Sequence, residues 1–333
     1  MSGAKLPIQR VFITGGAGYV GAVLVPKLLA EGYAVTVYDL MLYGDDVLPQ
    51  DDALTLIKGD IRDQAKLCPA LAGHDAVIHL ACISNDPSFE LNPALGKSIN
   101  LDAFRPLVEA SLDAGITRFI YASSSSVYGV KQEPNVHEDM TLEPLTDYSH
   151  FKAECEKILA EYQAENFTTV TLRPATVCGY SPRQRLDVVV NILTNHAWHN
   201  REITVFGGAQ LRPNLHILDM ASAYLTLLKA SCETVAGEVF NFGCENHSVQ
   251  RLAEIVRTEV GDDVLLRHVS TDDNRSYHVS SAKAAAVLGL YPEHSVEEAV
   301  RDLCIAFQAG QLPDSLKDER YFNIKRMQSI NLQ

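Results

Sequence analysis

Strand-length apolar runs alternate with helix-length segments through the first half of the chain. This order predicts a parallel sheet covered by helices on both faces, because parallel strands need long crossover connections. The runs that predict strands are residues 11–14, 34–38, 54–58, 75–81, 118–123 and 167–173, and the segments that predict helices are 20–31, 64–72, 92–114 and 148–166.

Glycines follow the first predicted strand in the spacing of a dinucleotide-binding turn. Gly16, Gly18 and Gly21 form G-x-G-x-x-G, and Gly15 offers a second reading with Gly18 and Gly21. Such glycines allow a tight turn and let the backbone approach a pyrophosphate at a helix N-terminus. Asp39 ends the next predicted strand, about 20 residues later, where a carboxylate binds the ribose 2′-hydroxyl and repels a 2′-phosphate. The pattern predicts NAD rather than NADP.

Beyond residue 176, short strands mix with helices, which predicts a second, smaller unit. We expect an α/β fold, with a Rossmann-type doubly wound parallel sheet in residues 1–176 and a mixed α/β substrate-binding domain in 177–333. Residues of about 214–242 are expected to return to the first domain. The sequence of residues 312–333 predicts no role for that segment. The later strands are expected at 203–206, 238–242 and 264–268, and the later helices at 186–197, 217–230, 248–260 and 296–309.

Tyr148 and Lys152 are four residues apart near the start of a predicted helix, so their side chains share one face. The ammonium favours the phenolate form, which makes the phenol a general acid/base near neutral pH. Y-x-x-x-K alone is common and often only a solvated surface. Here a dinucleotide-binding turn and a serine run, Ser123 to Ser126, precede it, and together they predict a catalytic site.

Composition and charge narrow the class of protein. The 333 residues are 47% hydrophobic and 21% charged, without an apolar run of membrane-spanning length or an N-terminal signal segment. We therefore expect a soluble cytoplasmic enzyme without a membrane partner. Seven cysteines without C-x-x-C predict reduced thiols and no metal site. The net charge of −14 argues against nucleic acid as a partner, and requires local positive charge wherever an anion binds.

From residue 10 to about 310, the chain resembles the extended short-chain dehydrogenase/reductases that act on nucleotide sugars. Residues 181–187, with Asn191, are similar to a subgroup that modifies sugars, including heptoses, for bacterial surface polysaccharides. The motifs that carry the broader resemblance are T-G-G-A-G-Y-V-G (14–21), Asp60-Ile61, His79-Leu80-Ala81, Asn100, S-S-S-S-V-Y-G (123–129), Tyr148 to Lys152, Leu172-Arg173-Pro174, Leu211-Arg212 with His216 to Asp219, Arg275-Ser276-Tyr277, Lys283 and Leu288-Gly289.

The resemblance implies roles for individual residues. The Ser124 hydroxyl would hydrogen-bond the reacting sugar oxygen, Tyr148 would exchange that oxygen's proton, and Lys152 would hold the nicotinamide ribose and tune Tyr148. His79 is expected to be structural and Ser123 to be a turn residue. The residues implied to bind NAD are Gly15, Gly18, Tyr19, Val20, Gly21, Asp39, Asp60, Ile61, Leu80, Ala81, Asn100, Tyr148 and Lys152.

A nucleotide-diphosphate sugar is the implied substrate, and its diphosphate calls for guanidinium groups. Arg212 and Arg275 match family positions that contact it. Pro213 follows Arg212 where relatives have Asp, so the resemblance does not predict the backbone conformation there. A solvated Arg185 is an equally good reading. The residues expected to bind substrate are Ser84, Ser125, Ser126, Arg183, Arg185, Asn191, Arg212 and Arg275.

The reaction that we expect is C4 epimerisation through a transient 4-keto sugar. A net 4-dehydrogenase or reductase, possibly of a GDP-heptose, and a non-catalytic NAD sensor are the alternatives. The family's 4,6-dehydratases carry Asp-Glu after the catalytic Ser/Thr, where this chain has Ser125 and Ser126. A homodimer is also expected, through the helices at 92–114 and 148–166, which relatives use for a four-helix contact.

Overall fold

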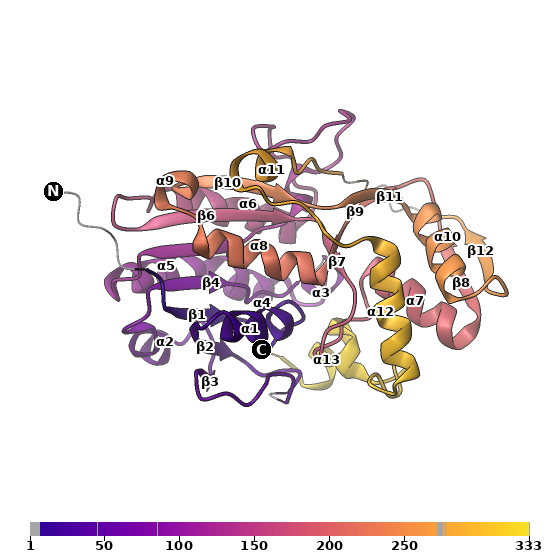
Figure 1. The fold of residues 1–333 in the computed structure, drawn as a ribbon, viewed down its shortest axis with the longest axis horizontal. Coiled ribbons are helices and arrows are strands. Elements are labelled where there is room, and N and C mark those ends of the chain that lie inside the picture. The colour runs from indigo at the N-terminus through magenta and orange to yellow at the C-terminus, as the bar shows by residue number, and fades with distance from the viewer. Residues whose placement is uncertain (1–6, 45, 85, 272–275, 277, 333) are drawn as a thin grey trace.

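A seven-stranded, wholly parallel sheet forms the centre of the molecule (Figure 1). The computed structural model describes residues 7–44, 46–84, 86–271, 276 and 278–332. The strand order is β10-β6-β5-β4-β1-β2-β3, so the expected Rossmann-type α/β fold is confirmed. The strands are β1 Arg10–Thr14, β2 Ala34–Asp39, β3 Leu54–Lys58, β4 Ala76–His79, β5 Arg118–Ala122, β6 Thr168–Pro174 and β10 Glu238–Phe242.

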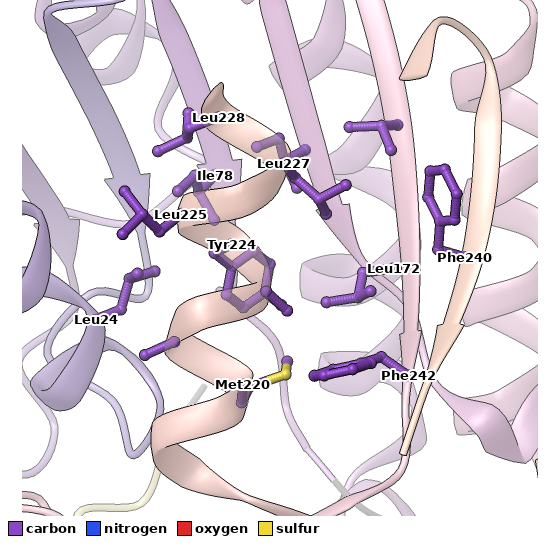
Figure 2. Close-up of a cluster of buried hydrophobic side chains, with 14 of the residues drawn as sticks. Leu24, Ile78, Leu172, Met220, Tyr224, Leu225, Leu227, Leu228, Phe240 and Phe242 are labelled. Carbon is purple, nitrogen blue, oxygen red and sulfur yellow. The ribbon is translucent and has the colours of Figure 1, made fainter. Parts of the chain in front are cut away.

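Helices cover both faces of this sheet. On one face, α1 (Gly21–Ala30) packs beside α8 (Ile217–Lys229), and α11 (Ala282–Leu288) lies by β10. Figure 2 shows how Tyr224 and Leu227 of α8 pack among Ile78, Leu172 and Phe240 from the sheet. The other face carries α2 (Gln64–Leu71), α5 (Phe104–Asp113) and α6 (Asp147–Ala160) around a second buried cluster. The sheet is therefore buried on both sides, as an all-parallel sheet requires.

The strand order reverses between β1 and β4. From β1 the chain proceeds outward through β2 and β3, then crosses back to start β4 on the other side of β1. The residue pairs Thr14–Tyr38 and Thr14–His79 place the carboxyl ends of these three strands level with one another. In open α/β sheets, a crevice at this switch point binds the ligand.

The single helix predicted at 92–114 is wrong, because the structure has three elements there. Helix α4 (Pro93–Lys97) leads into a π-helical turn, Ser98–Asp102, before α5 begins. The widened turn carries Asn100, whose amide accepts from the Ile83 N–H at 2.8 Å and donates to the Ile83 carbonyl at 2.9 Å. Insertions of this kind are frequent at functional sites. Helix α6 also ends at Ala160, earlier than expected.

A smaller unit surrounds a separate core of α7 (Val189–Asn200), α10 (Val249–Val260) and α12 (Val296–Gln308). No helix in the described ranges combines the length and apolarity that crossing a bilayer needs. Two small sheets and several short helices complete the fold. They are β7 Thr176–Cys178 with β9 Leu211–His216 and β11 Glu245–Ser248, β8 Glu202–Phe206 with β12 Leu265–Val269, α3 Asp86–Glu90, a 3-10 turn at Ser125–Tyr128, and α9 Cys232–Val235.

The C-terminal segment leaves the smaller unit and returns to the sheet domain. A 3-10 turn, Glu319–Tyr321, precedes α13 (Asn323–Ser329), which packs against α3. Arg326 Nε donates to the Leu42 carbonyl at 2.6 Å, so α13 is tied to the loop after β2. Figure 1 shows this yellow segment beside the indigo N-terminal elements. Residues 312–332 thus have a definite place beside the switch point, which their sequence pattern did not predict.

Candidate active site

A cavity of about 520 Å³ opens at the carboxyl ends of the central strands, at the switch point. It joins the glycine turn to the serine run and to Tyr148, and it reaches the segment at 183–189 and the C-terminal segment. The residues predicted for the site that line it are Gly15, Gly18, Tyr19, Val20, Gly21, Asp39, Asp60, Ile61, Leu80, Ala81, Ser84, Ser124, Ser125, Ser126, Tyr148, Lys152, Arg183, Arg185 and Arg212.

The glycine turn has the backbone that a dinucleotide-binding loop needs. Gly15 has φ +75°, and a Cβ there would lie 2.5 Å from the Ala81 nitrogen, so only glycine lets this turn approach β4 closely. Gly21 begins α1 with its own Cβ position occupied by the Gly16 backbone. The helix N-terminus thus lies at the cavity, where its dipole favours a pyrophosphate. This arrangement fits NAD.

One end of the cavity carries the carboxylates expected to bind adenosine. Asp39 accepts hydrogen bonds from the Ala17 N–H at 3.0 Å and the Met41 N–H at 2.7 Å. Burial raises the pKa of the Asp39 carboxyl, while these amides and the Arg183 charge oppose the shift. Asp60 pairs with Arg62 at 2.6 Å. Partial burial acts against the Asp60 charge, but the Arg62 hydrogen bonds outweigh it and lower the pKa.

The other end carries the residues expected to react. Lys152, which is 5% exposed, donates from Nζ to the Ala122 carbonyl at 2.6 Å, and its ammonium lies 5.8 Å from the centre of the Tyr148 ring. A capping box between Thr146 and Ser149 fixes the start of α6, and with it the Tyr148 backbone. Ser124 Oγ lies 2.9 Å from Ser126 Oγ on the adjoining turn. A phenol, an ammonium and a hydroxyl therefore share one wall of the cavity.

A buried polar network supports this wall from beneath. Ser123 donates to Glu156, one helical turn beyond Lys152, so Ser123 does more than form the turn we expected. Glu156 pairs with Arg173, whose Nη2 lies 2.6 Å from Oε2, and both side chains are less than a tenth exposed. Arg173 also donates to the Tyr128 hydroxyl at 2.6 Å. The network links β5, α6 and β6, and so fixes the elements beside Ser124, Tyr148 and Lys152.

His79 has the structural role expected of it. Its Nδ1 lies 2.7 Å from Thr14 Oγ1, and its ring stacks on Tyr121. Burial lowers the pKa of His79 to about 3, so the imidazole is neutral. A neutral, enclosed ring between β1 and β5 packs the sheet and is not available for proton transfer with a ligand.

Two neighbouring arginines, Arg183 and Arg185, line the cavity. Arg183 stacks on Tyr43, with 3.4 Å between the guanidinium carbon and the ring centre, and it interacts electrostatically with Asp39. Burial lowers the pKa of Arg183. Arg185 donates from Nε to Asp187 at 2.6 Å and interacts electrostatically with Tyr148. Burial acts against the Arg185 charge, but Asp187 outweighs it and raises the pKa.

Two predicted ligand-binding asparagines do not line the cavity. The Asn100 amide is hydrogen-bonded to both backbone groups of Ile83, as described above. Asn191 accepts from the Gly179 N–H at 3.0 Å and donates to Tyr19 and Arg185, which anchors the arginine segment to the glycine turn. An amide can satisfy both groups of a backbone residue, so a buried asparagine serves well as a loop clamp. Arg275, also expected to bind substrate, lies outside the described residues.

Sequence reasoning missed residues that complete the cavity. Asn323 of α13 accepts from Arg183 Nη2 at 2.6 Å and from the Tyr43 hydroxyl at 3.0 Å. It also donates to Ser84 Oγ at 2.9 Å and, through its backbone, to Asp187 at 2.9 Å. A lone asparagine in a polar tail gives no pattern to detect, because its role depends on contacts far away in the sequence. The missed lining residues include Tyr43, Ile99, Thr176, Val177, Asp187, Met220, Tyr224, Asn323, Met327 and Leu332.

The chain is similar to known proteins over most of its length. A UDP-glucose 4-epimerase of Lactobacillus helveticus is 28% identical over 309 residues, which cover 86% of this chain and 93% of that protein. A dTDP-glucose 4,6-dehydratase of Streptomyces niveus is 27% identical over 308 residues, covering 85% and 88%. The solved structure of MoeE5 in complex with UDP-glucuronic acid and NAD is 26% identical, with a TM-score of 0.78 and coverage of 90% and 99%.

The family assignment rests on a family model that matches more than half of the chain. The sequence model of the NAD dependent epimerase/dehydratase family matches residues 11–243, which include the glycine turn, the serine run and Tyr148 with Lys152. The cavity provides a dinucleotide-binding turn at one end and a phenol with an ammonium at the other. The chain therefore belongs to the NAD-dependent epimerase/dehydratase family, and its cofactor is NAD.

Proposed function

We propose that the protein is a nucleotide-sugar C4 epimerase. The observation that carries the proposal is that Ser124, Tyr148 and Lys152 line the same cavity as the NAD-binding turn. The first relative described above, a UDP-glucose 4-epimerase, supports this reading. Bound NAD supplies the hydride acceptor and donor for carbon 4 of the sugar.

The residues of this chain manage the proton and the orientation of the sugar. The Tyr148 phenol exchanges the proton of the sugar's 4-hydroxyl, as a general acid/base does. The Ser124 hydroxyl hydrogen-bonds the same oxygen, and the Lys152 ammonium stabilises the phenolate. Because Lys152 is buried and held by the Ala122 carbonyl, its charge stays close to the ring. Enclosure also protects the 4-keto sugar from escape while it turns over to present its other face.

Dehydration is disfavoured by the chemistry of the cavity wall. Removal of water needs an acid for the leaving hydroxyl and a base for the neighbouring proton, and serine hydroxyls at 125 and 126 supply neither without an activating partner. The carboxylates that line the cavity within the described ranges are Asp39, Asp60 and Asp187. Each is already engaged by amide hydrogen bonds or an arginine. This favours epimerisation over the reaction of the dehydratase relatives.

Two alternatives follow from the same site. A net 4-dehydrogenase or reductase, possibly acting on a GDP-heptose, would use Ser124, Tyr148 and Lys152 in the same way but would exchange its cofactor at every turnover. A non-catalytic NAD sensor would not require these three residues. Their shared position on the cavity wall favours an enzyme.

The substrate half of the cavity has positive charge for a diphosphate. Arg212 of β9 and Arg185 line it, and two guanidinium groups suit a nucleotide diphosphate in a protein of net charge −14. Pro213 is accommodated within β9, opposite Asn246 of β11.

We assign residues 177–333 mainly to the substrate domain, with about 214–242 in the NAD-binding domain. We further propose a cytoplasmic homodimer through α5 and α6, which light scattering at several concentrations would test: a constant monomer mass would refute it.

Incubation with a panel of nucleotide sugars tests the proposed reaction. We expect a product of the same mass as its substrate, without a stoichiometric change in absorbance of reduced nicotinamide. A product lighter by one water would establish a dehydratase. A product differing by two hydrogens, with matching cofactor consumption, would establish the dehydrogenase or reductase, and inactivity on the whole panel would favour the sensor.

A further inference from the structure

We propose that Arg183 binds the pyrophosphate of NAD rather than the substrate, and that Asn323 of the C-terminal helix positions it. The C-terminal segment would thereby form one wall of the cofactor site and slow the release of NAD. This inference concerns cofactor retention, and it does not require the reaction to be an epimerisation.

The first observation is the side of the cavity on which Arg183 lies. Its guanidinium stacks on Tyr43, in the loop that follows β2, and it interacts electrostatically with Asp39 at the tip of that strand. Asp39 is the group placed to bind the adenosine ribose. Arg185, only two residues away, pairs with Asp187 and interacts electrostatically with Tyr43 and, to a lesser extent, with Tyr148. Arg185 therefore has a carboxylate partner, whereas Arg183 stacks on a ring and donates to an amide.

The second observation is the unfilled bonding capacity of Arg183. The residue is 4% exposed, and its Nε is buried without a hydrogen-bond partner among the described residues. Its Nη2 donates to a neutral amide oxygen of Asn323, not to a carboxylate. A buried guanidinium with an unused N–H group is costly unless an anion completes its hydrogen bonds. Arg183 lines the cavity together with the glycine turn, so the pyrophosphate of NAD is the anion within its reach.

The third observation is the position of Asn323. Its side chain joins Arg183, Tyr43 and Ser84, and its backbone N–H donates to Asp187. It therefore connects the loop after β2, the loop after β4 and the arginine segment at one point. Arg183 also hydrogen-bonds with Tyr43, so Asn323 and Tyr43 together hold the guanidinium. Loss of the Asn323 amide would therefore loosen the guanidinium at the pyrophosphate position.

The same segment supplies apolar cover. Met327 and Leu332 line the cavity and pack in the cluster that contains Ile61 and Ile99. Ile61 follows Asp60, so this cluster lies at the adenosine end. Apolar side chains on both sides of a flat base exclude water from it. The adenosine half of NAD is thus expected to contact Met327 and Leu332.

Binding measurements test the proposal without turnover. Arg183→Met keeps an apolar stem on Tyr43 but removes the charge, and Arg183→Lys keeps the charge but loses the planar group. We expect Arg183→Met to weaken NAD and ADP binding about tenfold or more, as loss of a charge-assisted hydrogen bond predicts. Arg183→Lys should fall between this variant and the wild type, and adenosine affinity should be unchanged.

Asn323→Ala should speed the dissociation of NAD from the holoenzyme and weaken NAD and ADP binding, by less than Arg183→Met does. Gln328→Ala, an exposed change on the same helix, is the matched control and should have no effect. Arg185→Met should leave ADP affinity unchanged. Thermal melting without NAD identifies a variant that has lost its fold.

Unchanged NAD and ADP affinity in folded Arg183→Met would overturn the proposal. So would an equal loss of adenosine affinity, because that would indicate general damage to the pocket. If Arg183→Met raised KM for the nucleotide sugar but left NAD retention normal, Arg183 would bind the substrate and not NAD. Failure of every nucleotide sugar in the panel would leave these NAD and ADP measurements as decisive as before.

Discussion

The two ends of the cavity are built in different ways. The reactive end comes from β5, the serine turn, α6 and β6, which follow one another in the chain and share the Ser123–Glu156–Arg173 network. The adenosine end combines Asp39 and Tyr43 with Arg183 and, from the far end of the chain, Asn323. The difference teaches that the chemical groups are held by adjacent regular elements, while enclosure depends on contacts between distant segments.

This contrast has an energetic side. The Glu156–Arg173 pair is buried, bidentate and shared with neutral donors, so its geometry resists change. The Asn323 contacts are single hydrogen bonds from a seven-residue helix. Neutral hydrogen bonds contribute about 1 kcal/mol each, and one from a charged group about 2 kcal/mol. The reactive end should therefore be rigid, and the adenosine end should open more easily.

Removal of the phenol at the reactive end should have the largest effect. Tyr148→Phe should reduce turnover by roughly 10²–10⁴-fold, because a general acid/base is lost. NAD affinity should change little. Tyr162→Phe, just beyond the same helix and bonded to Glu109 and Arg105, is the control and should keep its activity. Steady-state kinetics with calorimetry of NAD binding checks both, and near-normal turnover of Tyr148→Phe would exclude its role.

Breaking the network beneath that end should destabilise the fold. Glu156→Gln leaves the Arg173 guanidinium buried without a counter-charge, which should lower the free energy of unfolding by about 3 kcal/mol. Glu154→Gln, on an exposed turn of α6 where the carboxylate pairs with Lys157, should cost less than about 0.5 kcal/mol. Urea denaturation followed by circular dichroism measures the difference. Equal stabilities for the two variants would mean that the network does not make this end rigid.

At the adenosine end, the charge of Asp39 should select the cofactor. NAD should bind more tightly than NADP, and Asp39→Ala should narrow or reverse the preference, because a carboxylate repels the 2′-phosphate. Asp52→Ala, in an exposed part of the following loop, should leave the preference intact. Titration calorimetry with both cofactors gives the ratio. Equal affinities in the unmutated protein would remove this role from Asp39.

A smaller effect is expected where the substrate diphosphate binds. Arg212→Ala should raise KM for the nucleotide sugar more than it lowers kcat, because the lost contact is remote from carbon 4 and stabilises ground and transition states alike. Arg251→Ala, an exposed change on α10, provides the comparison. Initial-rate kinetics separates the two constants. A KM that stays constant in Arg212→Ala would place the diphosphate elsewhere.

Much of the reactive end could be predicted from sequence, because its signals are local. The four-residue spacing of Tyr148 and Lys152 predicted that α6 presents both side chains together, and both line the cavity; glycine spacing likewise predicted the turn at the other end. Local signals could not distinguish Asn100 and Asn191, which clamp loops, from ligand-binding asparagines. Asn323 was missed for the converse reason: its role exists only because folding brings the end of the chain beside Tyr43 and Arg183. The π-helical turn at 98–102 likewise depends on Ile83, which lies outside the segment.

The fate of the hydrogen on carbon 4 tests the proposed function most directly. The protein, with its own bound NAD, would be incubated with a nucleotide sugar that carries deuterium at that carbon, and the product would be analysed by mass and NMR spectroscopy. If one retained NAD molecule takes up and returns the hydrogen, the C4-epimerised product keeps the deuterium at carbon 4. An epimer without the label, or label that accumulates in free cofactor, would contradict the account.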